Sequence, residues 1–214
     1  MTTNARTEIL DRVRAALGAH STERESDYGA IDRAYQRSGT RGPQESLRLL
    51  IDRVEDYGAS VYRCRSIDLP KTIGVVLDRR GKHDMVIPTE LQREWLPSGF
   101  NFVPDADLNA QVLNQSEGVL TGCTVAIALT GTIVLRHGAS EGRRALTLIP
   151  EYHLCVLRED QVVETVSEGL SRALIKPVGV VTTISGPSAT ADIEMTRIKG
   201  VHGPRTLDVI LVSA

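Results

Sequence analysis

Short apolar runs typical of buried strands alternate along this chain with segments of helical or loop character. Because consecutive parallel strands need crossover connections, this alternation favours a mainly parallel sheet covered by helices on both faces. The last run is rich in Leu, Ile and Val, and we expect it to close the chain as a strand. The expected strands are 60–64, 84–88, 100–103, 153–157, 178–184 and 206–212.

Two further apolar runs, 125–129 and 132–135, flank Thr130-Gly131. A glycine between two strand-like runs is typical of a tight hairpin. The sequence therefore predicts a hairpin at one edge of the parallel sheet.

The first 42 residues differ from the remainder. Ile9, Val13 and Leu17 recur at helical spacing and predict an amphipathic helix, whereas 19–42 holds few large apolar residues and is expected to be a mobile connection. A second helix begins at Pro43, which suits the first helical position. We therefore expect an N-terminal helix and linker over 1–42 and an α/β domain over 43–214.

Composition excludes several classes of protein. The chain is 41% hydrophobic and 24% charged, with 25 basic and 27 acidic residues, which is typical of an ordinary globular domain. The chain lacks the Lys/Arg cluster that is typical of nucleic-acid binding, so we expect no nucleic acid as a partner. It also lacks an apolar run long enough for membrane insertion. The three cysteines are far apart, so we expect a reducing, cytoplasmic setting and neither a metal site nor a cofactor such as an iron–sulfur cluster.

The common motifs of nucleotide-binding and hydrolytic enzymes do not occur. The chain has no G-x-x-x-x-G-K-[ST], no G-x-G-x-x-G after a strand, no H-E-x-x-H and no G-x-S-x-G. What remains is three glycine-punctuated segments that carry polar residues.

The first segment surrounds the expected hairpin. Thr124, Thr130 and Thr132 lie beside glycines, and with Gly131 they could offer hydroxyl and N–H groups to an anion. The alternative is that these threonines simply favour strand structure.

The second segment follows the expected strand 178–184. Ser185 and Gly186 are expected to form a strand-to-helix turn, with Ser188 or Thr190 capping a helix whose first turn holds Asp192. Free N–H groups at such a helix start can bind an anion, although capping without a ligand would use the same residues.

The third segment precedes the last strand. His202 lies between glycines and could transfer a proton, while Arg205 could bind a carboxylate or phosphate. A structural histidine and a local ion pair are the alternatives. Arg143, Arg144 and His153 form a weaker group, because adjacent arginines are commonly solvated surface charges.

Taken together, six ordered blocks within residues 116–212 resemble the LUD-domain family, and specifically its lactate utilization protein C type. The similarity before residue 116 is loose. The blocks are 122–128, 130–135, 143–150, 153–156, 185–194 and 200–205.

This resemblance implies a three-layer α/β/α fold like that of the ribose-phosphate isomerase, glucosamine-phosphate deaminase and CoA-transferase group. It also implies a role in oxidising L-lactate to pyruvate together with two partner proteins, one of which carries iron–sulfur clusters. The family supplies no established catalytic residue to carry over. It usually has glutamate before the Thr-Gly-Thr of the hairpin, where this chain has Leu129.

The leading hypothesis is a cytoplasmic, cluster-free component of a lactate-oxidation system that binds a small anionic ligand at the carboxyl edge of its sheet. One alternative is a self-sufficient isomerase or transferase that acts on a phosphorylated sugar or acyl thioester and uses His202 for proton transfer. A regulatory or scaffold subunit is the other.

Overall fold

The computed structural model describes residues 5–17, 29–32, 34, 36–175, 179–187, 189–191, 197–199 and 203–214. The chain divides into two compact units, Met1–Gln36 and Arg37–Ala214. The first unit contains α1 (Ala5–Leu17), which confirms the first expected helix. Ile9 and Val13 on its apolar face are exposed.

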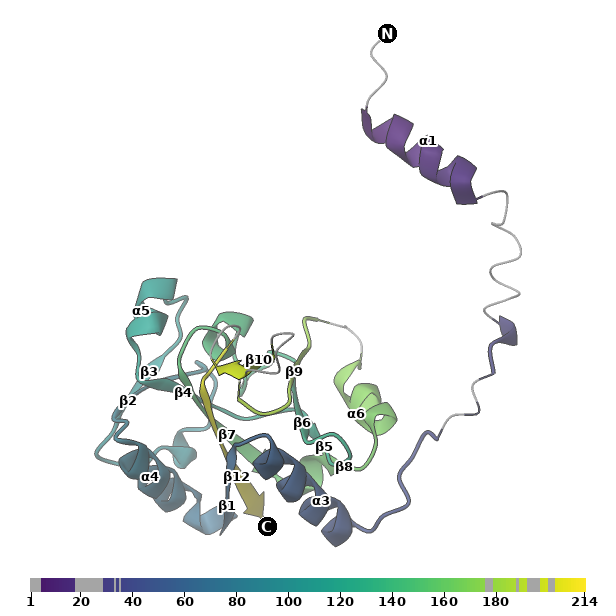
Figure 1. Ribbon diagram of the computed structural model, residues 1–214. Helices are drawn as coiled ribbons and strands as arrows, with labels where there is room; N and C mark the ends of the chain where they lie inside the picture. The colour runs from purple at the N-terminus through teal and green to yellow at the C-terminus, as the bar shows by residue number, and fades with distance from the viewer. Residues whose placement is uncertain are drawn as a thin grey trace. The chain divides into compact units, whose positions relative to one another are not determined.

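The second unit is built on a six-stranded sheet in the order β1-β12-β7-β4-β2-β3 (Figure 1). Every neighbouring pair in it is parallel, which confirms the predicted parallel sheet. The expected strand 178–184 is not among its strands, because Thr182–Ile184 pairs antiparallel in another sheet. Each of the six strands is short, and those in the middle are almost entirely buried. The strands are β1 (Ser60–Arg65), β2 (Asp84–Ile87), β3 (Asn101–Pro104), β4 (Gly118–Thr121), β7 (Tyr152–Arg158) and β12 (Thr206–Ser213).

Helices cover both faces of this sheet. On one face, α4 (Leu69–Arg80) packs Ile73 and Leu77 into a core shared with Leu154 and Ile210. On the other face lie α3 (Pro43–Asp56), α5 (Ala110–Gln115) and the 3-10 turn η3 (Arg144–Thr147). The α/β architecture expected from the sequence is therefore present.

The predicted hairpin forms, but its expected position is wrong. β5 (Val125–Ile127) and β6 (Thr132–Leu135) pair antiparallel around Gly131, whose φ is 58°. They are the middle strands of a separate four-stranded sheet that also contains β8 (Val162–Val163) and β9 (Thr182–Ile184).

Burial on both faces explains why this hairpin forms a layer of its own. Ala126 and Ile133 pack toward the parallel sheet, in the same core as Leu157. On the opposite face, Val125 and Val134 pack with Ala173 of α6 (Val166–Ala173).

The expected helix after Ser185 is wrong where the chain is described. Residues Ala189–Ala191 form strand β10, which pairs antiparallel with β11 (Arg197–Lys199). The rest of the expected helix, 192–196, lies outside the described residues. Within the described residues, no helix is long and apolar enough to cross a membrane.

Candidate functional site

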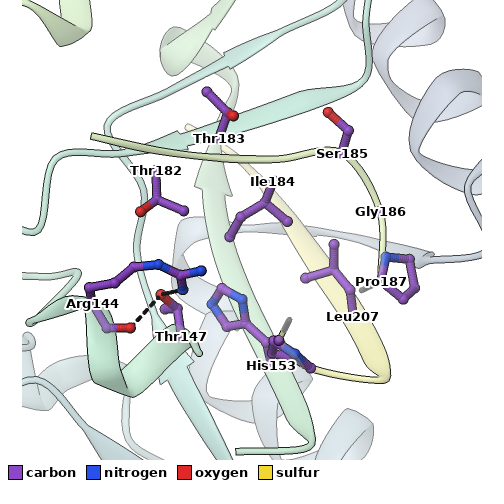
Figure 2. Close-up of a pocket in the computed structure, with 12 residues that line it drawn as sticks. Arg144, Thr147, His153, Thr182, Thr183, Ile184, Ser185, Gly186, Pro187 and Leu207 are labelled. Carbon is purple, nitrogen blue, oxygen red and sulfur yellow. Dashed lines mark hydrogen bonds between the residues drawn. The ribbon is translucent and has the colours of Figure 1, made fainter. Parts of the chain in front are cut away.

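A cavity of about 210 Å³ lies between the parallel sheet and β9 (Figure 2). Its floor comes from His153 and Leu207, which are neighbours in the register of β7 and β12 near the amino-terminal ends of those strands. Arg144 and Thr147 of η3 form one wall, and residues 182–187 form the opposite wall. A ligand here would not lie at the carboxyl edge of the parallel sheet, where we expected it.

His153 is 1% exposed and is the most unusual residue of the cavity. Its Nε2 lies 2.8 Å from Oγ1 of Thr121, and that hydroxyl donates to the carbonyl oxygen of Gly122 at 2.8 Å. Because the hydroxyl proton is already used, Nε2 carries a proton and donates to Thr121. Nδ1 therefore holds a lone pair, and it has no hydrogen-bond partner among the described residues.

Burial, with a smaller contribution from the nearby positive charge of Arg144, lowers the pKa of His153 from 6.5 to about 4. The imidazole is consequently neutral near pH 7. His153 thus presents a neutral, buried acceptor rather than a cation.

Arg144 is half-buried, and burial lowers the pKa of its guanidinium, which nevertheless stays charged. Its Nη1 donates to Oγ1 of Thr147 at 3.2 Å. No carboxylate pairs with it within the part of the chain that the structure describes. A half-buried guanidinium without a counterion is suited to binding an anionic group of a ligand.

The β9 wall is largely occupied by its own hydrogen bonds. Thr182 lies 2.8 Å, Oγ1 to Nε2, from His137, whose Nδ1 is 2.9 Å from the carbonyl oxygen of Gly142. Figure 2 shows Thr182 and Ile184 directed toward the side of Arg144 and His153, with Thr183 and Ser185 directed away. Ile184 and Leu207 therefore give the cavity an apolar side opposite its polar one.

A second cavity, of about 680 Å³, shares Arg144 and lies at the carboxyl ends of β2 and β3. Its other arginines are already bonded. Nε of Arg143 lies 2.6 Å from Oδ2 of Asp105, and Nη2 of Arg136 donates to the carbonyl oxygen of Ile175 at 2.7 Å. Arg144 lines both cavities, whereas His153 lines only the smaller one, so the smaller cavity combines the guanidinium with the unpaired ring nitrogen and is the better candidate.

Of the residues predicted from sequence, Ser185 and Gly186 line the smaller cavity. Gly186 has φ of 80° and lies so close to Tyr57 that a Cβ would collide with it. This position therefore requires glycine for two reasons, its backbone conformation and its packing.

The predicted threonines lie outside the cavity lining. Oγ1 of Thr124 donates to Oε1 of the buried Glu141 at 2.6 Å. Thr130, Thr132 and Ser185 form a chain of hydroxyls, with Oγ–Oγ distances of 2.8 Å and 2.9 Å, beside the Gly131 turn. These groups bind one another, and their role in ligand binding stays a prediction.

Arg205 is largely exposed, and its Nε lies 3.5 Å from Oε1 of Glu151. Ser188, Asp192 and His202 lie outside the described residues, and the side chain of Thr190 is not described either. The predicted roles of these residues stay predictions.

The described residues contain no group of three or more His, Cys, Asp or Glu side chains placed to hold a metal ion. The three cysteines are free thiols, with Cys123 and Cys155 buried and Cys64 partly exposed. A hydrogen bond with Cys155, together with burial, holds the pKa of the Cys123 thiol well above its usual value.

Sequence reasoning ranked Arg144 and His153 below the three glycine-punctuated segments. A signal for His153 was nevertheless present, because it lies within an apolar strand-like run. A histidine in such a position is buried and needs partners. The pairing with Arg144 depends on η3 lying over the start of β7, which no local pattern encodes.

Comparison with known proteins places the chain in a family. The model of the LUD domain matches residues 105–212, just over half of the 214 residues. A lactate utilization protein C from Deinococcus radiodurans is 44% identical over 171 residues, which cover 78% of this chain and 80% of that protein. Another, from an Exiguobacterium species, is 26% identical over 97% of this chain and 95% of its own length.

A solved structure agrees with these matches. The crystal structure of a DUF162 family protein from Deinococcus radiodurans superposes with a TM-score of 0.71 and 37% sequence identity, covering 81% of this chain and 99% of that one. The fold, the matched domain and the sequence identity therefore lead to one conclusion: this chain is a member of the LUD domain family.

Proposed function

We propose that this chain is the cluster-free component of an L-lactate oxidation system and that it binds a small carboxylic acid in the cavity between β7 and β9. The names of its relatives, lactate utilization protein C, support a role in lactate utilization. The chemistry of the cavity supports a carboxylate as the group that is bound.

The half-buried Arg144 is the observation that carries this proposal. A charge in such a position is unfavourable without a counterion, and the described residues supply no carboxylate for it. A ligand carboxylate can accept two parallel hydrogen bonds from a guanidinium, which gives both orientation and affinity. Ile184 and Leu207 provide an apolar surface for a short carbon chain.

Oxidation of lactate to pyruvate removes two electrons and two protons from the C2–H and O–H bonds. The electrons must pass to an acceptor, and we assign this acceptor to an iron–sulfur protein partner. In this scheme the chain holds the acid, the partner accepts the two electrons, and the two protons pass to solvent water.

Calorimetric titration of the purified chain with L-lactate tests the carboxylate site. L-Lactate is expected to bind, and Arg144→Gln is expected to weaken binding about 10- to 100-fold, because it removes a charged hydrogen-bond donor. Arg205→Gln is the matched control, since Arg205 is exposed and does not line the cavity. Its affinity should equal that of the wild type.

Two results would contradict the proposal. The first is an Arg144→Gln variant, shown to be folded by circular dichroism, that binds L-lactate as tightly as the wild type. The second is the absence of L-lactate binding together with Arg144-dependent binding of a sugar phosphate or inorganic phosphate. That second result would favour the isomerase or transferase alternative.

A further inference from the structure

The cavity contains a polar atom that Arg144 does not explain. Nδ1 of His153 is buried, carries a lone pair, and has no partner among the described residues. Buried acceptors in proteins are almost always paired with a donor, so one without a protein partner indicates a donor supplied from outside the chain. His153 lines the cavity, so its ring forms part of the wall that a bound ligand would contact.

We propose that His153 is a specificity-determining residue, whose Nδ1 selects acids that carry a hydroxyl group next to the carboxylate over the corresponding 2-oxo acids. This inference rests on the carboxylate site proposed for Arg144. Arg144 would recognise the carboxylate, and His153 would distinguish acids by the oxidation state of the carbon next to it.

The selection follows from which groups can donate. The hydroxyl of a 2-hydroxy acid has a proton and can donate to Nδ1 while Arg144 holds the carboxylate. The keto oxygen of a 2-oxo acid is only an acceptor, so it leaves Nδ1 unpaired and places two lone pairs near each other. A site built to bind a hydroxyl discriminates against the analogue that lacks it.

The surroundings of His153 keep this acceptor in place. Donation from the Thr121 hydroxyl to the carbonyl oxygen of Gly122 leaves Nε2 as the donor to Thr121, and we assign the tautomer from this network. Burial, more than the positive charge of Arg144, keeps the pKa of the ring low. Burial persists when a ligand carboxylate neutralises Arg144, so Nδ1 stays an acceptor.

Two substitutions separate the two ring nitrogens. His153→Gln places an amide near the Nε2 position, where it can still bond to Thr121, but it removes the acceptor at Nδ1. His153→Asn places an amide oxygen near the Nδ1 position and removes the group that bonds to Thr121. The expected order of preference for L-lactate over pyruvate is therefore wild type, then Asn, then Gln.

The first experiment compares the affinities of L-lactate and pyruvate for the unmodified full-length chain, measured by calorimetry. L-Lactate is expected to bind about tenfold more tightly than pyruvate, because its hydroxyl donates one hydrogen bond to Nδ1 and the keto oxygen of pyruvate leaves Nδ1 unpaired. In His153→Gln the two affinities should become equal, with pyruvate binding little changed, and in His153→Asn part of the preference should return.

A second measurement needs no variant. In ¹⁵N-labelled wild-type protein, L-lactate is expected to shift the Nδ1 resonance of His153 in the direction of a hydrogen-bonded acceptor, and pyruvate is not. Equal affinities of the wild type for the two acids, or an unmoved Nδ1 resonance at saturating L-lactate, would overturn the inference. Either result leaves the carboxylate site intact, provided that Arg144→Gln still weakens both acids, whereas loss of all acid binding would refute the site itself.

Discussion

The two faces of β7 and β12 differ in whether the chain supplies partners for their buried polar groups. Successive residues of a strand point to opposite faces of the sheet. The side chains of Tyr152 and His153 therefore lie on opposite faces, and so do those of Leu207 and Asp208. On the face toward α4, the buried Asp208 accepts from Nε and Nη2 of Arg80 at 2.8 Å and 2.6 Å. It also accepts from the hydroxyl of Tyr152 at 3.0 Å.

On the face toward β9, the described part of the chain gives Nδ1 of His153 no hydrogen-bond donor and gives Arg144 no carboxylate counterion. The difference separates a structural cluster from a candidate binding site. Where both partners are supplied by the chain, the polar groups stabilise the fold. Where one partner is missing, the same types of group are available to a ligand.

The largest effect on the free energy of unfolding is expected when the cluster of Asp208, Arg80 and Tyr152 loses its carboxylate. Asp208→Ala leaves Arg80 and the Tyr152 hydroxyl without their partner and should lower the free energy of unfolding by about 3–5 kcal/mol. Asp160→Ala is the matched control. It removes an exposed ion pair with Arg158, with a bond of 2.9 Å from Nε to Oδ1, and should cost less than about 1 kcal/mol. Urea unfolding of both variants measures the difference, and equal losses would contradict the distinction between the faces.

A smaller effect on the free energy of unfolding is expected when a fall in pH protonates His153, on the face toward β9. Well above pH 6.5 His153 is neutral in both the folded and the unfolded chain, so it contributes no pH dependence there. As the pH falls from 6.5 toward 4, the unfolded chain binds a proton that the folded chain does not, because the folded-state pKa is about 4. The free energy of unfolding should therefore decrease by about 3 kcal/mol across this range.

Urea unfolding of the wild type and of His153→Gln at pH 7.5 and pH 4.5 isolates this contribution. The variant keeps every other titrating group, so the share of acid destabilisation that it lacks belongs to His153. Identical losses of stability in the two proteins would show that the folded chain accommodates a protonated His153.

The parallel sheet could be predicted because its signal is local. Apolar runs such as 153–157 and 206–212 record burial, and their alternation with helical segments restricts the connections. The second sheet could not be predicted, because Val125 and Ala126 do not reveal that the two faces of their strand meet different layers. β4, with four buried residues, is also too short for its periodicity to be read.

The candidate site was less predictable than the fold. Segments containing glycine were predicted to bind a ligand because glycine adopts turn conformations and allows close approach of the backbone. Gly186, with its positive φ, does line the cavity. Arg144 and His153 were placed together only as neighbours in a weak group of charged residues. Their importance comes from burial and from missing partners, which are properties of the packed structure rather than of sequence spacing.

The smallest effect is expected at Leu129, where the chain departs from the glutamate usual in the family. A leucine beside the Thr130-Gly131 turn could line a ligand cleft near His202 and Arg205, or it could pack in the core. Leu129 is 41% exposed in the turn between β5 and β6, so it is not enclosed in the core, and it does not line the cavity around His153. Its N–H donates to the carbonyl oxygen of Glu164 at 3.1 Å, a bond that any side chain allows.

Leu129→Glu is therefore expected to change the free energy of unfolding by no more than about 0.5 kcal/mol, as is usual for an exposed substitution. Val75→Glu on α4 is the matched control, because Val75 is 45% exposed and remote from the turn in sequence. L-Lactate affinity should stay within about twofold of the wild type, since the new carboxylate lies outside the lining of the cavity that contains Arg144. A tenfold change in affinity without loss of stability would extend the binding site to the hydroxyls of Thr130, Thr132 and Ser185, and the site on the face toward β9 would then be larger than His153 and Arg144 define.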